Sequence, residues 1–156
     1  MTFDFKTYQE QALTTALPSA LTMDYLAPGL IAELGEVFGK QAKAVRDGWD
    51  TERLNREVCA ELGDCMWFLA IIAHTIHAND VRVASCSQGD LPFVFDSASN
   101  LMSYYPNKSD LNDLLKWVES EAKSHGSTLE VVAQANLDKL ASRQARGVLR
   151  GSGDTR

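Results

Sequence analysis

Apolar residues recur every three or four positions along most of this chain, which is the spacing of a helix with one buried face. The most regular stretch covers about residues 51–77, where the steps between apolar positions are 4, 4, 3, 4, 3 and 4. These positions are Leu54, Val58, Leu62, Cys65, Leu69, Ile72 and Ile76. The second half of the stretch is apolar nearly all round, so we expect it to be buried on several sides, with a second copy of the chain as one candidate cover.

Two further helices are predicted in the N-terminal half. One covers about residues 5–16 and is closed by Pro18. Its apolar positions are Phe5, Tyr8, Ala12, Leu13 and Ala16. The other begins near Pro28, a residue suited to the first turn of a helix, and stops at Asp47 and Gly48. A short turn connects it to the stretch at 51–77, across which the two helices can pack antiparallel.

The C-terminal half is less uniform. Residues from about 79 to 107 show no sustained period and predict a loop with room for one short irregular helix. Helices are then expected over about 110–124, ended by Gly126, and over about 127–144, where the sequence STLE at 127–130 matches a capping box. Strand signals are weak throughout, so the expected fold class is all-α.

Composition narrows the class of protein further. With 156 residues and 45% apolar content, the chain predicts a single domain over 1–156. A net charge of −6 argues against binding a nucleic-acid polymer through a basic surface. The longest apolar run, Cys65–Ala73, is too short to span a membrane, and the N-terminus does not resemble a signal peptide. Three cysteines without a CxxC motif indicate no disulfide framework, so a cytoplasmic protein without a membrane partner is expected.

One short sequence occurs twice, as AELGE at 32–36 and again as AELGD at 60–64. Each copy places two carboxylates three positions apart on a predicted helix, Glu33 with Glu36 and Glu61 with Asp64. If the two helices are antiparallel, the pairs can face each other, and four close carboxylates are stable as anions only beside cations. Oxygen ligands of this kind suit Mg²⁺ or Mn²⁺.

The glycine in each copy is explained by the same arrangement. A glycine inside a helix costs roughly 1 kcal/mol relative to alanine. Gly35 and Gly63 would remove bulk beside the carboxylates and allow close approach of a neighbouring helix or of a substrate.

Other interpretations of the acidic residues stay open. A single ExxE sequence on a helix is usually a solvated face, and the acidic pairs of a non-catalytic helical oligomerisation module could face a partner's basic patch. A di-metal oxidoreductase of the carboxylate-bundle type would need Glu-x-x-His, which does not occur here. His74 and His77 lie three positions apart, but His74 is ten residues, ~15 Å along a helix, beyond Asp64.

A second set of residues suits an anionic substrate. Asn136, Lys139 and Arg143 follow one another at spacings of 3 and 4 on the last predicted helix, which is also the pattern of an ordinary solvated stripe. Lys40 and Lys43 follow Glu36 by four and seven positions. Beside a metal site, these cations would neutralise a polyphosphate. No GxxxxGK(S/T) loop is present, so a P-loop enzyme is not expected.

The ordered set of motifs resembles the MazG-like all-α nucleoside triphosphate pyrophosphohydrolases. The segments GLIAELGEVFGKQAKAVRDG and EVCAELGDCMWFLA are similar to that family's ExxE and ExxD helices, and the segment from Thr128 to Arg156 is similar to its closing helix and tail. The resemblance covers about residues 1–77 and 128–156. It leaves an insert at about 79–126, which the short phage-type and bacterial members largely lack.

The resemblance implies a helical bundle completed by oligomerisation, as a homodimer or homotetramer. It also implies Mg²⁺-dependent hydrolysis of a nucleoside triphosphate to the monophosphate and pyrophosphate, with Mn²⁺ as a substitute metal. The expected substrate is a deoxynucleotide, and a purine nucleotide such as dGTP is the first to test. The location would be the cytoplasm, that of the host if the chain is of phage origin. A flexible tail at about 145–156 would close over the nucleotide.

Residue roles follow from the same resemblance. The implied metal ligands are Glu33, Glu36, Glu61 and Asp64, and Glu33 or Glu36 would help to deprotonate the attacking water. The resemblance implies phosphate contacts by Asn136, Lys139 and Arg143, with Arg146 and Asp154 as candidates in the tail. From their positions after Glu36, Lys40 and Lys43 are expected to reach the same substrate. The aromatic residues Phe93, Phe95, Tyr104, Tyr105, Trp49 and Trp67 are each either core residues or base-stacking residues.

Overall fold

A computed structural model describes residues 3–78, 81, 94–103 and 106–148, and all regular secondary structure in these residues is helical. The all-α prediction is therefore confirmed for this part of the chain. The elements are α1 (Phe5–Leu13), a short 3₁₀ helix (Pro18–Ala20), α2 (Met23–Asp47), α3 (Thr51–Thr75), α4 (Val94–Leu101), α5 (Lys108–Ser124) and α6 (Leu129–Ala145).

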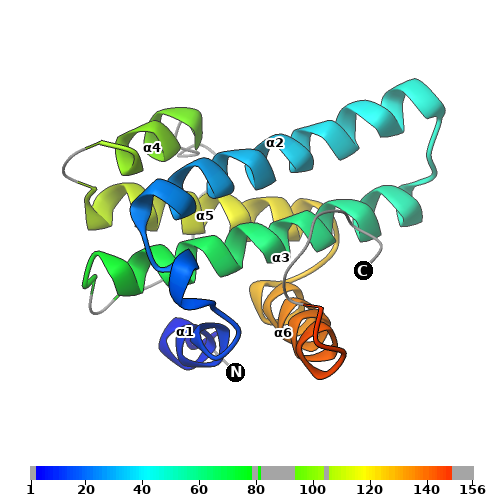
Figure 1. The fold of residues 1–156 in the computed structure, drawn as a ribbon. Helices are drawn as coiled ribbons and strands as arrows, with labels where there is room; N and C mark the ends of the chain where they lie inside the picture. Colours follow the sequence, from blue (N-terminus) through cyan, green and yellow to red (C-terminus); the bar gives the residue numbers. More distant parts are fainter. Residues whose placement is uncertain (1–2, 79–80, 82–93, 104–105, 149–156) are drawn as a thin grey trace.

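Helix α3 is the centre of the fold, because it packs against α1, α2, α5 and α6. Figure 1 shows α2 and α3 as two long helices running side by side in opposite directions, with α5 behind them and α4 beside the first half of α2. Helices α1 and α6 contact each other and are seen end-on below α3. The two copies of the repeated sequence are thus carried by neighbouring antiparallel helices, which is the condition under which their acidic pairs can face each other.

The apolar second half of α3 is buried by helices of its own chain. Leu62, Leu69, Ile71 and Ile72 have no exposed surface, and they belong to one core shared with the neighbouring helices. Among the described helices, α3 alone is long and apolar enough to cross a membrane, but 67% of its most apolar window is buried. Such burial is typical of the core helix of a globular fold.

Two prolines have different roles from those predicted. Helix α1 ends at Leu13, three residues early, and Pro18 begins the 3₁₀ helix instead of closing α1. Helix α2 begins at Met23, so Pro28 lies inside it. A proline there removes one backbone hydrogen bond, at a cost of about 3 kcal/mol. Burial of Leu26 and Ala27 in the turn before it offsets that cost and holds the turn in helical form.

The segment predicted as a loop contains one regular helix, α4, whose buried residues include Val94, Ala98 and Leu101. The cap of α6 also differs from the prediction. Its N-cap is Thr128, whose hydroxyl accepts from the backbone N–H of Val131 at 3.3 Å, so the capping box at 127–130 is wrong by one residue. Helix α5 ends as expected, because Gly126 adopts a φ of +70°.

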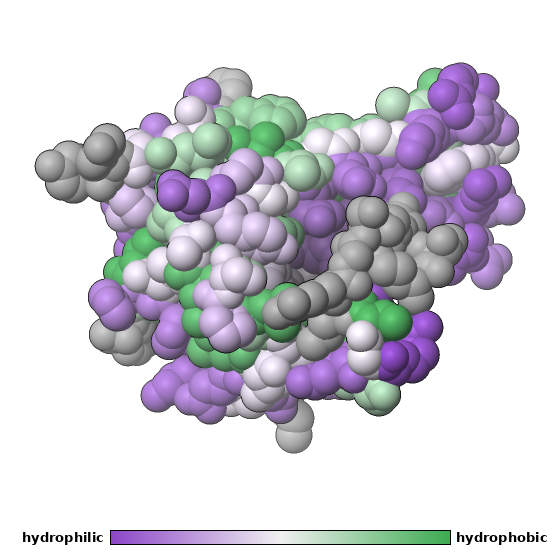
Figure 2. Space-filling view, in the orientation of Figure 1, coloured by the Kyte–Doolittle hydropathy of each residue, from purple (hydrophilic) through white to green (hydrophobic). Residues whose placement is uncertain are grey.

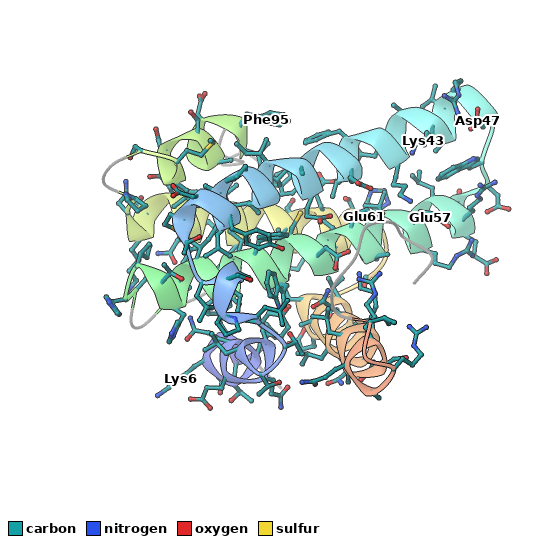
Figure 3. All side chains as sticks on the ribbon, in the orientation of Figure 1. Lys6, Lys43, Asp47, Glu57, Glu61 and Phe95 are labelled. Atoms are coloured by element: carbon teal, nitrogen blue, oxygen red, sulfur yellow. The ribbon has the colours of Figure 1, made fainter. Side chains whose placement is uncertain are left out.

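Polar surface is not evenly spread over this fold. Hydrophilic residues gather over the half of α2 and α3 nearest their connecting turn, on the right of Figure 2. Figure 3 shows that this half carries Lys43, Asp47, Glu57 and Glu61. More hydrophobic residues lie over α4 and the first half of α2.

Candidate metal centre

Three carboxylates from the two repeated sequences meet between α2 and α3. One oxygen from each of Glu33, Glu61 and Asp64 lies within 4.8 Å of the other two. Glu61 is buried, and the other two side chains are partly buried. The antiparallel packing places Glu33 of α2 beside both acidic residues of α3, which is the arrangement that the sequence predicted.

Glu36 is the fourth predicted ligand, and it lies at the edge of this group. Its side chain is exposed, and its oxygens are not among the three that meet. Its charge nevertheless raises the pKa of both Glu33 and Glu61, so its carboxylate is close to theirs. The geometry therefore supports a group of three carboxylates with a fourth nearby.

The electrostatics of the group favour a bound cation. Burial, followed by the charges of Asp64, Glu61 and Glu36, raises the pKa of Glu33 to about 7. Burial also raises the pKa of Glu61, although the nearby Lys40 opposes that shift. A divalent cation would relieve both the burial cost and the mutual repulsion. Carboxylate oxygens are the ligands that Mg²⁺ and Mn²⁺ prefer, so these residues fit such an ion.

Two of the predicted substrate-binding lysines contact the carboxylates directly. The ammonium nitrogen of Lys139 lies 2.5 and 2.6 Å from the two oxygens of Asp64. Lys40 lies 3.1 Å from Glu61 and 3.2 Å from Glu57. The site therefore holds carboxylates, which can bind a cation, in direct contact with lysines, which can bind an anion.

Asn136 joins the group from α6 and is itself held by α1. Its amide nitrogen donates to Asp64 at 2.9 Å, and its amide oxygen accepts from the hydroxyl of Tyr8 at 3.2 Å. The sequence indicated Asn136, but Tyr8 was counted only as an apolar position of the first helix. Glu57 was also missed, although it lies one helical turn before Glu61 and so shares its face.

The remaining predicted substrate residues are exposed or partly exposed, or they lie outside the described residues. Arg143 is partly exposed, one turn after Lys139 on α6, while Lys43 is exposed on α2 close to Asp47. Arg146 is exposed, and its side chain donates to the backbone oxygen of Ser142 at 3.3 Å. Asp154 lies outside the described residues.

The aromatic residues divide into several environments. Phe95 of α4 packs on Phe38, with ring centres 5.3 Å apart, and Trp49 lies under the guanidinium of Arg53 at 4.0 Å. Trp67, three residues after Asp64, donates from its indole nitrogen to the Thr15 hydroxyl at 3.0 Å. Phe93, Tyr104 and Tyr105 lie outside the described residues.

Comparison with known proteins finds a similar protein from a phage. The Gene 37 protein of Mycobacterium phage L5 is 31% identical over 158 aligned residues, which span 96% of each chain. No protein-family model matches the chain. No solved structure matches it either.

Proposed function

We propose that this chain, which belongs to the same family as the Gene 37 protein of Mycobacterium phage L5, is a metal-dependent hydrolase of nucleoside triphosphates. The observation that carries the proposal is the meeting of Glu33, Glu61 and Asp64 with ligand oxygens within 4.8 Å of one another. Lys40 and Lys139 lie directly beside these oxygens. A site of this composition suits a metal-bound polyphosphate better than a neutral substrate.

The metal would be Mg²⁺, or Mn²⁺ as a substitute, held by Glu33, Glu61 and Asp64, with Glu36 available at the edge. Bound there, it supplies charge neutralisation for the phosphates and a lowered pKa for a coordinated water.

The side chains of this chain perform the other tasks. Glu33 or Glu36 accepts the proton of the attacking water, whose oxygen bonds to either the α or the β phosphorus. The bond between the attacked phosphorus and the oxygen that bridges the α and β phosphates breaks, and either route gives the monophosphate and pyrophosphate. Lys40, Lys139 and Arg143 neutralise phosphate oxygens, and Asn136 orients Asp64. Lys43, Arg146 and Asp154 are further candidates for contacts with the nucleotide.

The resemblance to MazG-like enzymes extends the proposal. It supports a homodimer or homotetramer as the active unit and a deoxynucleotide, with dGTP first, as substrate. A phage relative is consistent with action in the cytoplasm of an infected host. Neither a nucleic-acid polymer nor a membrane is part of the proposal.

The test is product analysis by anion-exchange chromatography. The purified protein is incubated in the presence of Mg²⁺ with each of the eight common ribo- and deoxynucleoside triphosphates, one nucleotide in each reaction. We expect monophosphate and pyrophosphate in equal amounts from at least one of them, and the ranking identifies the base. If every triphosphate survives with Mg²⁺ and again with Mn²⁺, hydrolysis of common nucleotides is wrong.

Substitution of the site residues gives the matching control. Asp64→Asn and Glu36→Gln are expected to abolish turnover with the fold retained, whereas Asp113→Asn on α5, paired with Lys116, is expected to leave turnover unchanged. Full activity in both site variants would contradict the metal-dependent reaction. Iron-dependent oxygen uptake would instead indicate an oxidoreductase, although the three-carboxylate group contains no histidine among the described residues. Absence of metal binding in calorimetry would indicate a non-catalytic module.

A further inference from the structure

Tyr8 of α1 is a buried polar residue to which the reaction above gives no role. Its side chain is 3% exposed, and its hydroxyl bonds to the amide oxygen of Asn136, 128 positions away in the chain. Asn136 is also 3% exposed, and the other end of its amide bonds to Asp64. A continuous chain of two hydrogen bonds therefore connects α1 to a proposed metal ligand on α3.

The chemistry of the three groups determines which one donates and which one accepts in each of these two hydrogen bonds. An ionised carboxylate only accepts hydrogen bonds, so the amide of Asn136 must present its NH₂ group to Asp64. The amide oxygen then faces Tyr8, which must donate. The reversed amide would place its oxygen against the carboxylate, where neither group can donate, and this buried oxygen without a partner would cost about 1–3 kcal/mol.

Two further observations support a fixed arrangement. Burial and the charge of Asp64 raise the pKa of Tyr8 far above its usual range, so the hydroxyl keeps the proton that it donates. Gly63 lies directly under Asn136, and a Cβ at that position would lie 3.1 Å from the Asn136 Cβ. The glycine of the second repeated sequence thus allows α6 to approach closely enough for Asn136 to reach Asp64.

We propose that Tyr8 is a positioning residue of the metal centre, which holds the Asn136 amide in the orientation that aligns Asp64 for its ligand role. This inference rests on the proposed function, because it assumes that Asp64 binds a metal. It assigns α1, which carries none of the predicted ligands, a part in the site. Groups that hydrogen-bond to metal ligands commonly contribute 10- to 100-fold in metal affinity.

The experiment measures Mn²⁺ binding by calorimetry in the whole protein without nucleotide. Tyr8→Phe removes only the hydroxyl and keeps the ring that packs beside Phe3. We expect Mn²⁺ binding on the order of tenfold weaker, at the lower end of the range for outer partners. Tyr25→Phe is the control, because it removes the hydroxyl of an exposed tyrosine, and it is expected to bind like the unmodified protein.

A double-substitution cycle separates positioning from simple packing. If Tyr8 acts through Asn136, Tyr8→Phe has no further effect on Mn²⁺ affinity once Asn136 is replaced by alanine. Asn136→Ser serves in the cycle if Asn136→Ala does not fold, as judged by thermal unfolding. An equal loss in both backgrounds would overturn the inference.

Two other outcomes would overturn either the role of Tyr8 alone or the proposed metal centre as well. Mn²⁺ binding by the unmodified protein together with equal binding by Tyr8→Phe overturns the role of Tyr8 and leaves the proposed function standing. Failure of the unmodified protein to bind Mn²⁺ overturns the metal centre itself, and the role of Tyr8 with it.

Discussion

At the level of single residues, the lysines of the site have two possible partners. Lys139 pairs with both oxygens of Asp64, and Lys40 pairs with Glu61. Both carboxylates are proposed metal ligands, so an arriving metal ion competes with an ammonium group for the same oxygens. The displaced lysines would then be free to contact phosphate. Metal binding and substrate binding would therefore be linked through the same two side chains.

This competition predicts opposite effects from one substitution. Lys139→Met should tighten Mn²⁺ binding in the absence of nucleotide by roughly fivefold, because the lost ion pair is partly exposed and worth about 1 kcal/mol. The same variant should bind a non-hydrolysable triphosphate more weakly, since one phosphate-neutralising charge is gone. Calorimetry measures the first effect and equilibrium dialysis the second.

The control is Lys123→Met, which breaks the ion pair with Glu119 on α5 and should change neither binding constant. Weaker metal binding by Lys139→Met would show that the lysine organises Asp64 rather than competing for it.

At the level of elements, the two glycines of the repeated sequence lie in different surroundings. No described atom outside the helix lies within 4 Å of the position that a Cβ on Gly35 would take. A Cβ on Gly63 would lie 3.1 Å from the Asn136 Cβ and 3.4 Å from the Val132 oxygen. Both glycines were predicted to allow close approach of a helix or of a substrate. Close helix approach is confirmed at Gly63, and approach of a substrate to Gly35 stays a prediction.

Alanine at the two positions should consequently have different effects on stability. Gly35→Ala is expected to raise the unfolding free energy by up to about 1 kcal/mol, because alanine favours the helix and meets open space. Gly63→Ala gains the same propensity but is expected to be less stable than Gly35→Ala by about 1–3 kcal/mol, the usual cost of overpacking. Urea unfolding of both variants measures the difference, and equal stabilities would contradict it.

The same elements show how far sequence alone could predict the structure. Helix periodicity and the short turn at 48–50 were sufficient to place Glu33 opposite Glu61 and Asp64. Glu36 has the same offset from Glu33 that Asp64 has from Glu61, but α6 covers Asp64 with Asn136 and Lys139, whereas Glu36 is exposed. Contacts between distant segments of the chain determine which carboxylate is covered and which is exposed, and a local sequence pattern does not predict these contacts.

Tyr8 and Pro28 illustrate the same limit. The spacing of α1 correctly made Tyr8 a buried position, but its bond to Asn136 depends on how α1 and α6 cross α3. Pro28 has a local preference for a helix start, yet tertiary burial of the residues before it extended α2 toward the N-terminus. In both cases packing of the whole fold outweighed the local signal.

At the level of the whole molecule, the proposed metal centre lies where α2 and α6 pack against α3, the central helix of the fold. The carboxylate group brings together residues from separate helices, so it exists only in the folded chain. A ligand that binds only the folded form raises stability according to its concentration and affinity. Metal binding should therefore be visible as a change in the melting temperature of the entire protein.

The pH dependence of that melting temperature is the last prediction. Glu33 has a pKa of about 7 in the folded protein and 4.5 as its ordinary value. Between these values the folded form keeps a proton that the unfolded chain releases, so the contribution of Glu33 to the unfolding free energy falls as pH rises through this window and is constant above it. Glu61, whose pKa burial also raises, adds a slope of the same sign. After allowance for the partial exposure of Glu33, the fall should be on the order of 1 kcal/mol, a few degrees in Tm.

Calorimetry of the metal-free protein, in a buffer that contains a chelator, measures Tm from pH 5 to 8 and tests this prediction. In the variant Glu33→Gln, most of the fall in Tm with rising pH should disappear. Saturating Mn²⁺ should raise Tm more at pH 8 than at pH 5, because a protonated carboxylate must lose its proton before it binds a metal. The same slope in Glu33→Gln would exclude Glu33 as its source. An equal gain from Mn²⁺ at both pH values would mean that the ion binds away from the three carboxylates, since only there does binding compete with the proton of Glu33.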